Sequence, residues 1–453
     1  MIDLEVVLQK ALVVHPVRTG HRSNVSQLDL EEAIGLTEAL GVEATASEII
    51  TLREIKAANY FGKGKIDDMA ALIAQHDLKL VVVNTTLAPI QQRNLEEIWD
   101  VKVIDRTGMI LEIFALRAAT KEGSLQVELA RLGYEKSRLV RTWTHLERQR
   151  GGQGFLAGPG ETQIESDRRM IDDKMAKLMR DLDQVRRTRA LQRTQRKRAP
   201  ERVVALVGYT NAGKSTLFNR LTDGSVFVKD MLFATLDTTH RILRLPSGTN
   251  AVMSDTVGFI SDLPTDLIDA FRATLEEVKE ADLLIHVRDI SDPLSEARKQ
   301  DVLAILDSIE AGPKHDQQMI EVWNKIDLVS TDDMESLIDT SKAVNRGEQN
   351  TLSFPISCIK GLGLDILMDG IEENLSQFDE IVDVTIMPKD YSIRAWLHEH
   401  GDVLSEEIGD VGQTVMKVRI PKVNVGMLRG RHPQIFKDKL VTPEVVDGPA
   451  WSP

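Results

Sequence analysis

The first hundred residues alternate between short apolar runs and amphipathic stretches. Four apolar runs have the length of strands: Ala11–His15, Val42–Thr45, Leu78–Val83 and Val101–Ile104. Two stretches between them have helical spacing, Leu30–Leu40 and Pro89–Ile98. Short apolar strands that alternate with helices are typical of a parallel α/β unit. The pattern therefore predicts an N-terminal α/β domain over residues 1–105.

After Gly108 the apolar periodicity is helical and predicts one continuous helix up to a glycine-rich stretch at 151–160. This stretch has five glycines and a proline in ten residues, so it predicts a long loop and no helix. Apolar residues then recur at steps of four and three, as in a coiled-coil seam, at Ile171, Met175, Leu178, Leu182 and Val185. We predict a helical hairpin over residues 106–200 that ends at Ala199-Pro200.

Strand and helix patterns alternate again from residue 201 to about 375 and predict a second α/β domain. The segment 376–453 has strand patterns at Ile381–Met387 and Thr414–Ile420, and a helix pattern at Ser392–Glu399. This arrangement predicts a small C-terminal α+β domain.

Composition narrows the class of protein. With 453 residues, 42% hydrophobic and 28% charged, the chain has enough material for several globular domains. Its single cysteine excludes an intramolecular disulfide framework and a thiolate zinc cluster, and fits a reducing compartment. The start Met1-Ile2-Asp3 has no basic region before an apolar run, and no uncharged run has the length of a membrane span. We therefore expect a cytoplasmic protein.

The net charge of −14 argues against indiscriminate binding to polyanions. A local basic patch nevertheless exists, because residues 168–200 hold twelve basic side chains against four acidic ones. Such a run can neutralise RNA phosphates, and the alternative is a solvated face of a coiled coil.

A phosphate-binding motif follows the apolar strand pattern Val203–Val207. The sequence Gly208-Tyr209-Thr210-Asn211-Ala212-Gly213-Lys214-Ser215 matches G-x-x-x-x-G-K-[ST], and a helix pattern follows it. In this motif backbone N–H groups cradle the phosphates, the lysine reaches the outer phosphates and the Ser hydroxyl holds Mg²⁺. The strand–loop–helix context argues against the alternative, a plain glycine turn. The candidate binding residues are Gly208, Asn211, Ala212, Gly213, Lys214, Ser215 and Thr216.

Three further motifs follow in order. Asp255-Thr256-Val257-Gly258 ends a strand pattern, so the carboxylate of Asp255 suits a Mg²⁺ site and the Gly258 amide could meet the γ-phosphate. Asn324-Lys325-Ile326-Asp327 follows another strand, and a carboxylate there can accept hydrogen bonds from two donors of guanine that adenine lacks.

The fourth element, which includes Ser357 and Cys358, stands where a loop would support the base, and we expect Cys358 to be a small buried residue and not a nucleophile. In their linear order the four motifs resemble the G domain of the translation-factor-related GTPases, and they favour GTP and GDP with Mg²⁺ over ATP.

A switch loop has to carry a threonine that contacts Mg²⁺ and the γ-phosphate. Thr235 is the first candidate and Thr238 or Thr239 are the alternatives. Phe259 stands where Ras-like proteins carry a glutamine that orients water, which predicts slow intrinsic hydrolysis and acceleration by a partner; a phenyl ring that simply packs is compatible with this. Asn211 resembles an asparagine that holds K⁺ in some related GTPases, which gives a hypothesis of K⁺ stimulation.

Residues 1 to about 370 resemble the HflX family of GTPases. The matching segments are Gly158–Arg169, Tyr60–Lys65, Gln91–Glu96, Asp105–Gly108 and Gln126–Ala130. Two departures are Asp237-Thr238-Thr239, where the family has Asp-Pro-Thr, and the stretch Gly154–Gly158, which looks longer and lacks an expected basic residue. The contacts of that basic residue are therefore not carried over. For Gly62-Lys63-Gly64-Lys65 the family suggests contact with nucleotide or RNA, and a plain loop is an equal alternative.

The resemblance implies a monomeric GTPase that binds rRNA of the large (50S) ribosomal subunit and splits or rescues stalled or stress-arrested ribosomes, with hydrolysis stimulated by the ribosome. The predicted fold class is α/β: a P-loop GTPase domain over 201–375, preceded by a small parallel α/β domain and a helical hairpin, and followed by a small α+β domain. Two other functions stay open: a ribosome-assembly factor that binds RNA and uses GTP as a structural ligand, and an ATP-dependent RNA-remodelling enzyme.

Overall fold

The computed structural model describes residues 9–19, 23–149, 159–196, 202–222, 233, 238–261, 272–346, 351–377, 379–409 and 412–436. Contacts divide the chain into two compact units. The smaller unit contains the C-terminal sheet with most of the preceding helix, together with Arg202 and residues 244–251 of the central sheet, and the larger unit contains the other described residues. Among the described residues, every helix is too short or too polar to cross a bilayer.

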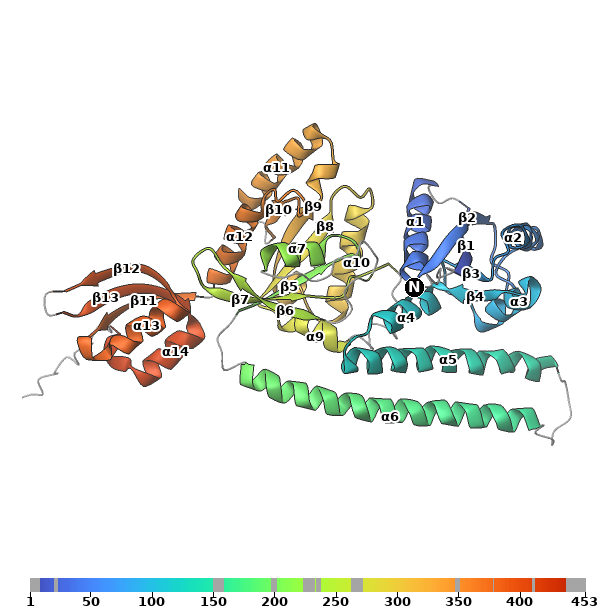
Figure 1. Cartoon of the computed structure of the whole chain (residues 1–453), viewed down its shortest axis with the longest axis horizontal. Coiled ribbons are helices and arrows are strands. Elements are labelled where there is room, and N and C mark those ends of the chain that lie inside the picture. Colours follow the sequence, from blue (N-terminus) through green and yellow to red (C-terminus); the bar gives the residue numbers. More distant parts are fainter. Residues whose placement is uncertain are drawn as a thin grey trace, which may run out of the picture. The chain divides into compact units, whose positions relative to one another are not determined.

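The N-terminal region is a four-stranded parallel sheet in the order β2-β1-β3-β4 (Figure 1). Its elements are β1 (Gln9–Arg18), α1 (Ser23–Ala39), β2 (Val42–Leu52), α2 (Lys63–His76), β3 (Leu80–Val83), α3 (Pro89–Trp99), β4 (Lys102–Asp105) and α4 (Arg106–Arg117). Side chains of α1 and α4 pack on one face of the sheet and those of α2 and α3 on the other. Because both faces are covered, β3 is wholly apolar and buried, and the predicted parallel α/β unit is confirmed.

The segment Gly62-Lys63-Gly64-Lys65 begins a helix. Gly62 is the N-cap residue of α2 in an extended conformation, and Lys63 is the first helical residue. Glycine is acceptable as an N-cap residue because that position has a non-helical backbone conformation. The plain loop that the sequence left open is therefore wrong for Lys63, Gly64 and Lys65.

The expected continuous helix after Gly108 is wrong, because two helices occupy this stretch. Ala118 leaves the helical conformation at the end of α4, with ψ 105°. The hydroxyl of Thr120 then accepts a hydrogen bond from the Gly123 N–H at 3.0 Å and starts α5 (Lys121–Gln149). The apolar periodicity continues across this break, so it could not reveal the break.

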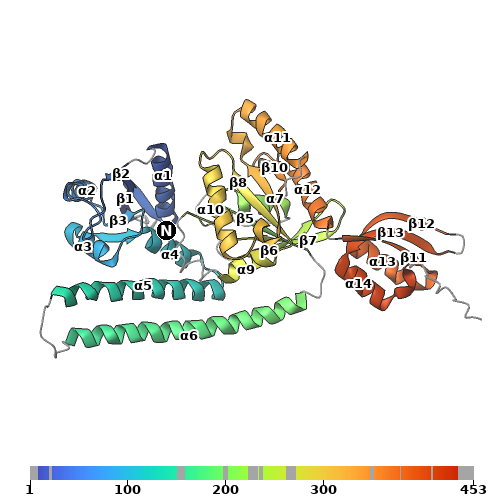
Figure 2. The same cartoon turned by 180° about the vertical axis from the view of Figure 1, so that it is seen from behind.

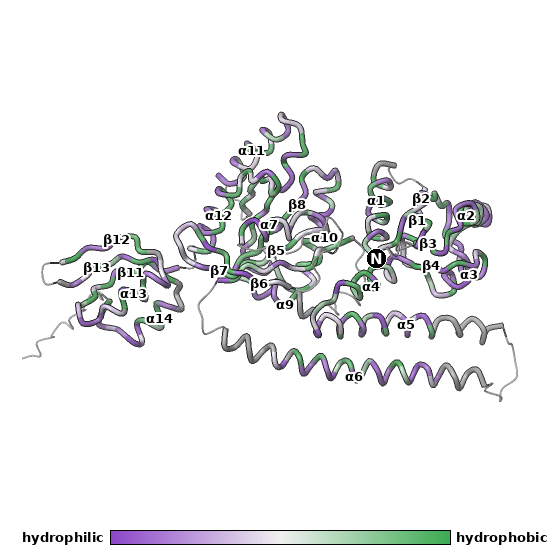
Figure 3. The backbone as a smooth tube through the Cα atoms, in the orientation of Figure 1, coloured by the Kyte–Doolittle hydropathy of each residue, from purple (hydrophilic) through white to green (hydrophobic). Residues whose placement is uncertain are grey.

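A long helix, α6 (Pro159–Arg196), runs beside α5, as Figures 1 and 2 show. The prediction that the helix with the apolar seam packs on the helix before the glycine-rich stretch is therefore confirmed. Pro159 and Gly160 are helical, in contrast to the predicted loop, because proline at a first helical position loses no hydrogen bond. The rest of the glycine-rich stretch, and Ala199-Pro200, lie outside the described residues. Hydrophilic and hydrophobic segments alternate along the described part of α6 (Figure 3).

The central region is a six-stranded sheet in the order β10-β9-β8-β5-β7-β6. The pairs β5–β8, β8–β9 and β9–β10 are parallel. Its elements are β5 (Arg202–Gly208), α7 (Lys214–Leu221), β6 (Thr239–Arg244), β7 (Asn250–Asp255), α9 (Arg272–Glu280), β8 (Leu283–Asp289), α10 (Ser295–Ser308), β9 (Gln318–Asn324), α11 (Thr331–Arg346), β10 (Ser353–Pro355) and α12 (Leu364–Ser376), with 3₁₀ turns at Pro313–His315 and Ile326–Leu328. The four motifs follow the carboxyl ends of β5, β7, β9 and β10.

The C-terminal part is a three-stranded antiparallel sheet in the order β11-β13-β12 with two helices packed on it. Its elements are β11 (Asp379–Ile386), α13 (Tyr391–His400), β12 (Asp402–Ile408), β13 (Thr414–Pro421) and α14 (Lys422–Arg431), with 3₁₀ turns at Pro388–Asp390 and Pro433–Ile435. The predicted small α+β fold is confirmed, and β12 and α14 are elements that the sequence pattern did not indicate.

Candidate active site

The phosphate-binding motif forms a tight loop between β5 and α7. Gly213 has φ +98°, and a Cβ at this position would lie 2.1 Å from Asn324 Nδ2. Gly208 has φ +150°, and its Cβ would lie 2.3 Å from the carbonyl oxygen of Val287. Both positions therefore require glycine. A side chain would clash with a neighbouring element, and a residue with a Cβ would be strained at these positive φ values.

Lys214 lies at the first turn of α7 with its ammonium inside the loop. Its Nζ donates hydrogen bonds to the carbonyl oxygens of Gly208 at 3.0 Å and Tyr209 at 2.7 Å. Complete burial lowers the pKa of Lys214 to about 8, although Asp255 acts in the opposite direction. A Cβ on Gly258 would lie 3.1 Å from this ammonium, so the fold brings Lys214 and Gly258 together.

Ser215 and Asp255 come together from two elements 40 residues apart. The Ser215 hydroxyl donates to Asp255 Oδ2 at 2.7 Å, and the Asp255 carboxylate is fully buried at the end of β7. The next residue, Thr256, is held because its hydroxyl donates to the Leu206 carbonyl at 2.5 Å. A hydroxyl and a carboxylate are hard oxygen donors of the kind that Mg²⁺ prefers, so this pair fits a Mg²⁺ ion.

Asn324 connects the phosphate-binding loop to the predicted base-binding loop. Its Nδ2 donates to the Ala212 carbonyl at 2.9 Å, and its Oδ1 accepts from the Cys358 N–H at 3.2 Å. Asp327 lies just beyond, half-buried in the 3₁₀ turn that follows β9. The structure therefore brings the phosphate-binding loop and the two predicted guanine-binding segments to one edge of the sheet.

The loop with Ser357 and Cys358 is held by its own backbone. The Ser357 N–H donates to the Leu362 carbonyl at 3.0 Å, and its hydroxyl accepts from the Lys360 N–H at 3.1 Å. Cys358 is buried, and burial raises its pKa to about 12, so it stays a thiol. The expectation of a small buried cysteine is confirmed.

Phe259 packs in the hydrophobic core at 3% exposure. Its N–H donates to the Gly208 carbonyl at 3.1 Å and its carbonyl accepts from the Thr210 N–H at 2.8 Å. These two bonds join the segment after Asp255 to the end of β5. Of the candidate switch threonines, Thr235 lies outside the described residues, and Thr239 is the first residue of β6.

Sequence reasoning missed three side chains that support the loops of the site. Asp289, at the end of β8, pairs with Lys325 at 2.7 Å, and Arg220 of α7 donates to the Ile359 carbonyl at 2.8 Å. Tyr209 carries its phenol on the phosphate-binding loop and is buried. An aspartate at a strand end was a usable signal for Asp289, whereas the variable positions of the loop motif gave none for Tyr209.

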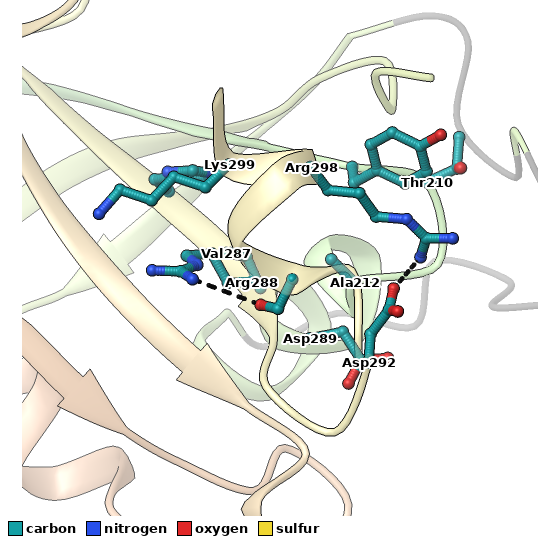
Figure 4. A pocket seen from close by; sticks show the side chains of 11 residues that line it. Thr210, Ala212, Val287, Arg288, Asp289, Asp292, Arg298 and Lys299 are labelled. Atoms are coloured by element: carbon teal, nitrogen blue, oxygen red, sulfur yellow. Dashed lines mark hydrogen bonds and ion pairs between the residues drawn. The ribbon is translucent and has the colours of Figure 1, made fainter. Parts of the chain in front are cut away.

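A small pocket is lined by residues of the phosphate-binding loop, β8 and α10. Figure 4 shows Thr210 and Ala212 from the loop beside Arg298 of α10 and Arg288 of β8. Its volume of about 10 Å³ is room for about one water molecule. Burial lowers the pKa of His286 in its lining to about 3, so that imidazole is neutral. This pocket is far too small for a nucleotide and is not the substrate site.

Three family models match consecutive parts of the chain. They are described as "GTP-binding GTPase N-terminal" over residues 27–115, "GTP-binding GTPase Middle Region" over 117–196 and "50S ribosome-binding GTPase" over 203–325. A GTPase HflX from Magnetococcus marinus is 42% identical over 95% of this chain and 96% of that protein. The chain belongs to the HflX family of GTPases. It is accordingly an enzyme that binds guanine nucleotide and hydrolyses GTP.

A second member of this family is also similar over most of the chain. A GTPase HflX from Escherichia coli is 39% identical over 94% of this chain and 97% of its own. A solved GTP-binding protein from Sulfolobus solfataricus in complex with GDP is 24% identical, covers 82% of this HflX-family chain and 99% of that protein, and has a TM-score of 0.45. The two HflX relatives and the three family models confirm the resemblance read from the sequence motifs.

Proposed function

We propose that this HflX-family GTPase binds the large ribosomal subunit in its GTP-bound form and separates stalled or stress-arrested ribosomes. The observation that carries the proposal is the match of its central region to a family described as 50S ribosome-binding GTPases. The α5–α6 hairpin, with exposed basic side chains on α6, supplies a surface that can neutralise RNA phosphates. Hydrolysis on the ribosome then releases the protein, which acts in the cytoplasm as a monomer.

The chemistry proposed for the site is phosphoryl transfer to water by positioning and charge neutralisation. Lys214 exchanges its two carbonyl partners for the outer phosphates, and the Gly258 amide donates to the γ-phosphate. Mg²⁺ would neutralise charge on the phosphates. Its ligands would be Ser215, Asp255 and a switch threonine, for which Thr235 is the first candidate. Asp327 accepts hydrogen bonds from guanine, while Asn324, Ser357 and Cys358 support the base.

Buried Phe259 has no group that can orient the attacking water. Without a partner, hydrolysis is therefore slow, and the ribosome supplies part of the roughly 10⁵-fold acceleration of assisted GTPases. GTP turnover measured with and without ribosomes tests this point. A lack of stimulation would favour an assembly factor that uses GTP as a structural ligand.

The decisive experiment is a sedimentation profile of intact ribosomes with the full-length protein and a non-hydrolysable GTP analogue. We expect the 70S peak to decrease, free subunits to appear and the protein to travel with the large subunit. If the protein binds the ribosome but the subunits stay together, the proposed ribosome binding is supported and the proposed splitting activity is excluded. ATP hydrolysis that survives in Lys214→Ala would instead support an RNA-remodelling enzyme that uses another site.

K⁺ stimulation is proposed on Asn211, which is exposed on the phosphate-binding loop with φ +59°. A carboxamide oxygen there is available for a cation next to the phosphates. Hydrolysis rates in K⁺ and Na⁺ at equal ionic strength test the idea, and Asn211→Ala should remove any difference. Equal rates in the two salts would exclude it.

A further inference from the structure

The phenol of Tyr209 lies at a junction that the phosphate chemistry above does not use. Tyr209 is the second residue of the phosphate-binding loop and is 5% exposed. Its hydroxyl donates to Glu32 Oε2 of α1 at 2.6 Å and accepts from the Ser261 N–H at 2.9 Å. The Ser261 Oγ lies 2.8 Å from the same hydroxyl. Ser261 follows Gly258 by three residues, so the phenol joins two functional segments.

Glu32 is fixed by charged partners. Its Oε1 accepts from Arg106 Nη2 at 2.6 Å, and Arg298 lies 3.7 Å from its Oε2. Arg106 Nη2 also donates to the Ser261 carbonyl at 3.1 Å. The side chains of Glu32 and Arg106 are only 10% and 8% exposed. Hydrogen bonds and ion pairs in such a buried site favour one arrangement, so Glu32 orients the phenol and Arg106 holds the segment that the phenol contacts.

The segment from Gly258 to Ser261 is thus fixed along its length. Its start lies next to the Lys214 ammonium, where the outer phosphate is expected. Its middle is joined to β5 by the two backbone bonds of Phe259, and its end is held by Tyr209 and Arg106. Burial and the nearby Glu32 carboxylate raise the pKa of Tyr209, so the phenol remains a hydrogen-bond donor at physiological pH.

We propose that Tyr209 is a positioning residue for the triphosphate: its hydroxyl, oriented by Glu32, holds the segment from Gly258 to Ser261 where the Gly258 amide meets the γ-phosphate. A segment that is ordered before the ligand arrives costs less entropy to bind. GTP gains from this order because it reaches Gly258, and GDP does not. The phenol therefore raises the preference of the enzyme for GTP over GDP. This inference rests on the GTPase activity and on the role proposed for Gly258, and not on ribosome binding.

The test compares full-length wild type and Tyr209→Phe, which removes only the hydroxyl. Affinities for a non-hydrolysable GTP analogue and for GDP are measured by calorimetry. We expect the variant to bind the GTP analogue about 5- to 10-fold more weakly, as expected for one lost buried hydrogen bond, and to bind GDP as wild type does. An equal loss for the two nucleotides, no loss, or tighter binding of the analogue would overturn the proposal.

Two further variants keep the test sharp. Glu32→Gln retains an acceptor for the phenol but weakens the ion pair, so we expect a smaller loss that is also confined to the GTP analogue. Because the two residues act through one hydrogen bond, the double variant should lose less binding free energy for the GTP analogue than the two single variants lose together. Tyr391→Phe is the matched control, since that phenol is exposed in the C-terminal part and should change neither affinity.

Gly258→Ala separates the two assignments. The added Cβ would lie 2.9 Å from Thr210 Cγ2, so it displaces the amide from the γ-phosphate position. A selective loss of GTP-analogue binding in Gly258→Ala, with none in Tyr209→Phe, would overturn the role of Tyr209 and keep that of Gly258. If neither variant changes the preference, the two roles fail together, and the ribosome proposal is unaffected.

Discussion

At the scale of single residues, the site depends on a lysine that is buried before any phosphate is bound. The ammonium of Lys214 is held by two carbonyl groups and loses its hydration, which is why its pKa falls to about 8. The group is therefore charged below about pH 8 and loses its charge above it. Because kcat/KM reports the ionisation of the free enzyme, it should reveal this titration.

We predict that kcat/KM for GTP falls as the pH rises from about 7 to about 9, approaching tenfold per pH unit above the pKa of Lys214. Steady-state hydrolysis across this range provides the measurement. Lys214→Gln is the control, because its residual activity should lack this decline while the nucleotide's own titration is shared by the two proteins. A wild-type profile parallel to that of the variant would contradict the prediction.

Gly213 gives a second prediction at this scale. In Gly213→Ala the added Cβ would meet Asn324 Nδ2 at 2.1 Å, in a backbone conformation that alanine avoids. Asn324 would then lose its bonds to the phosphate-binding and base loops, and we expect affinity for GDP and GTP to fall by at least about 1.4 kcal/mol, a factor of ten. Gly133→Ala in α5 is the matched control, since nothing lies within 4 Å of its Cβ position, and it should bind nucleotide normally.

At the scale of elements, one carboxylate connects the hairpin to the N-terminal sheet. Asp105 is fully buried at the junction of β4 and α4, and its Oδ1 accepts from the Gly108 N–H at 2.8 Å. Two donors on α5 also reach this carboxylate: the Tyr134 hydroxyl donates to Oδ1 and Arg138 Nη2 donates to Oδ2, each at 2.6 Å. The same carboxylate therefore caps α4 and fixes α5, which makes it the point where the hairpin joins the sheet.

We predict that Asp105→Ala destabilises the protein by about 3–5 kcal/mol, the cost of breaking a buried ion pair. The loss should appear as faster amide hydrogen exchange in α4 and in the first half of α5, and as a lower denaturant midpoint. Asp172→Asn is the comparison, because its pair with Lys136 is 45% and 30% exposed and such pairs contribute at most about 1 kcal/mol. Unchanged exchange in α5 would show that Asp105 does not fix the hairpin.

At the scale of the whole molecule, charge is distributed unevenly. The chain carries a net charge of −14, yet the described part of α6 exposes Lys174, Lys177 and Arg180 on one helix. The acidic remainder repels RNA, so the hairpin is the surface that we propose for ribosome binding. Counterion release then makes that binding sensitive to salt.

We predict that affinity for the large subunit falls at least tenfold when monovalent salt rises from about 0.1 to about 0.3 M. Lys177→Glu with Arg180→Glu should weaken binding further and flatten the salt dependence, measured by co-sedimentation with purified subunits. Lys314→Glu with Lys342→Glu, on exposed positions of the central region, is the control of equal charge change. Equal losses in the two double variants would argue against the hairpin as the binding surface.

The sequence alone determined the parallel N-terminal unit, the hairpin seam, the α+β class of the C-terminal part and the four motifs, because each depends on local periodicity or on fixed spacing within a few residues. It could not determine the break at Ala118, since the apolar period continues across it, nor the helical start at Lys63, since glycine is acceptable there. Only the tertiary structure decided which polar groups meet, as in Tyr209 with Glu32, 177 residues apart, or Asp105 with Arg138. Such contacts depend on how elements pack, and packing follows from the whole core and from no single stretch of the chain.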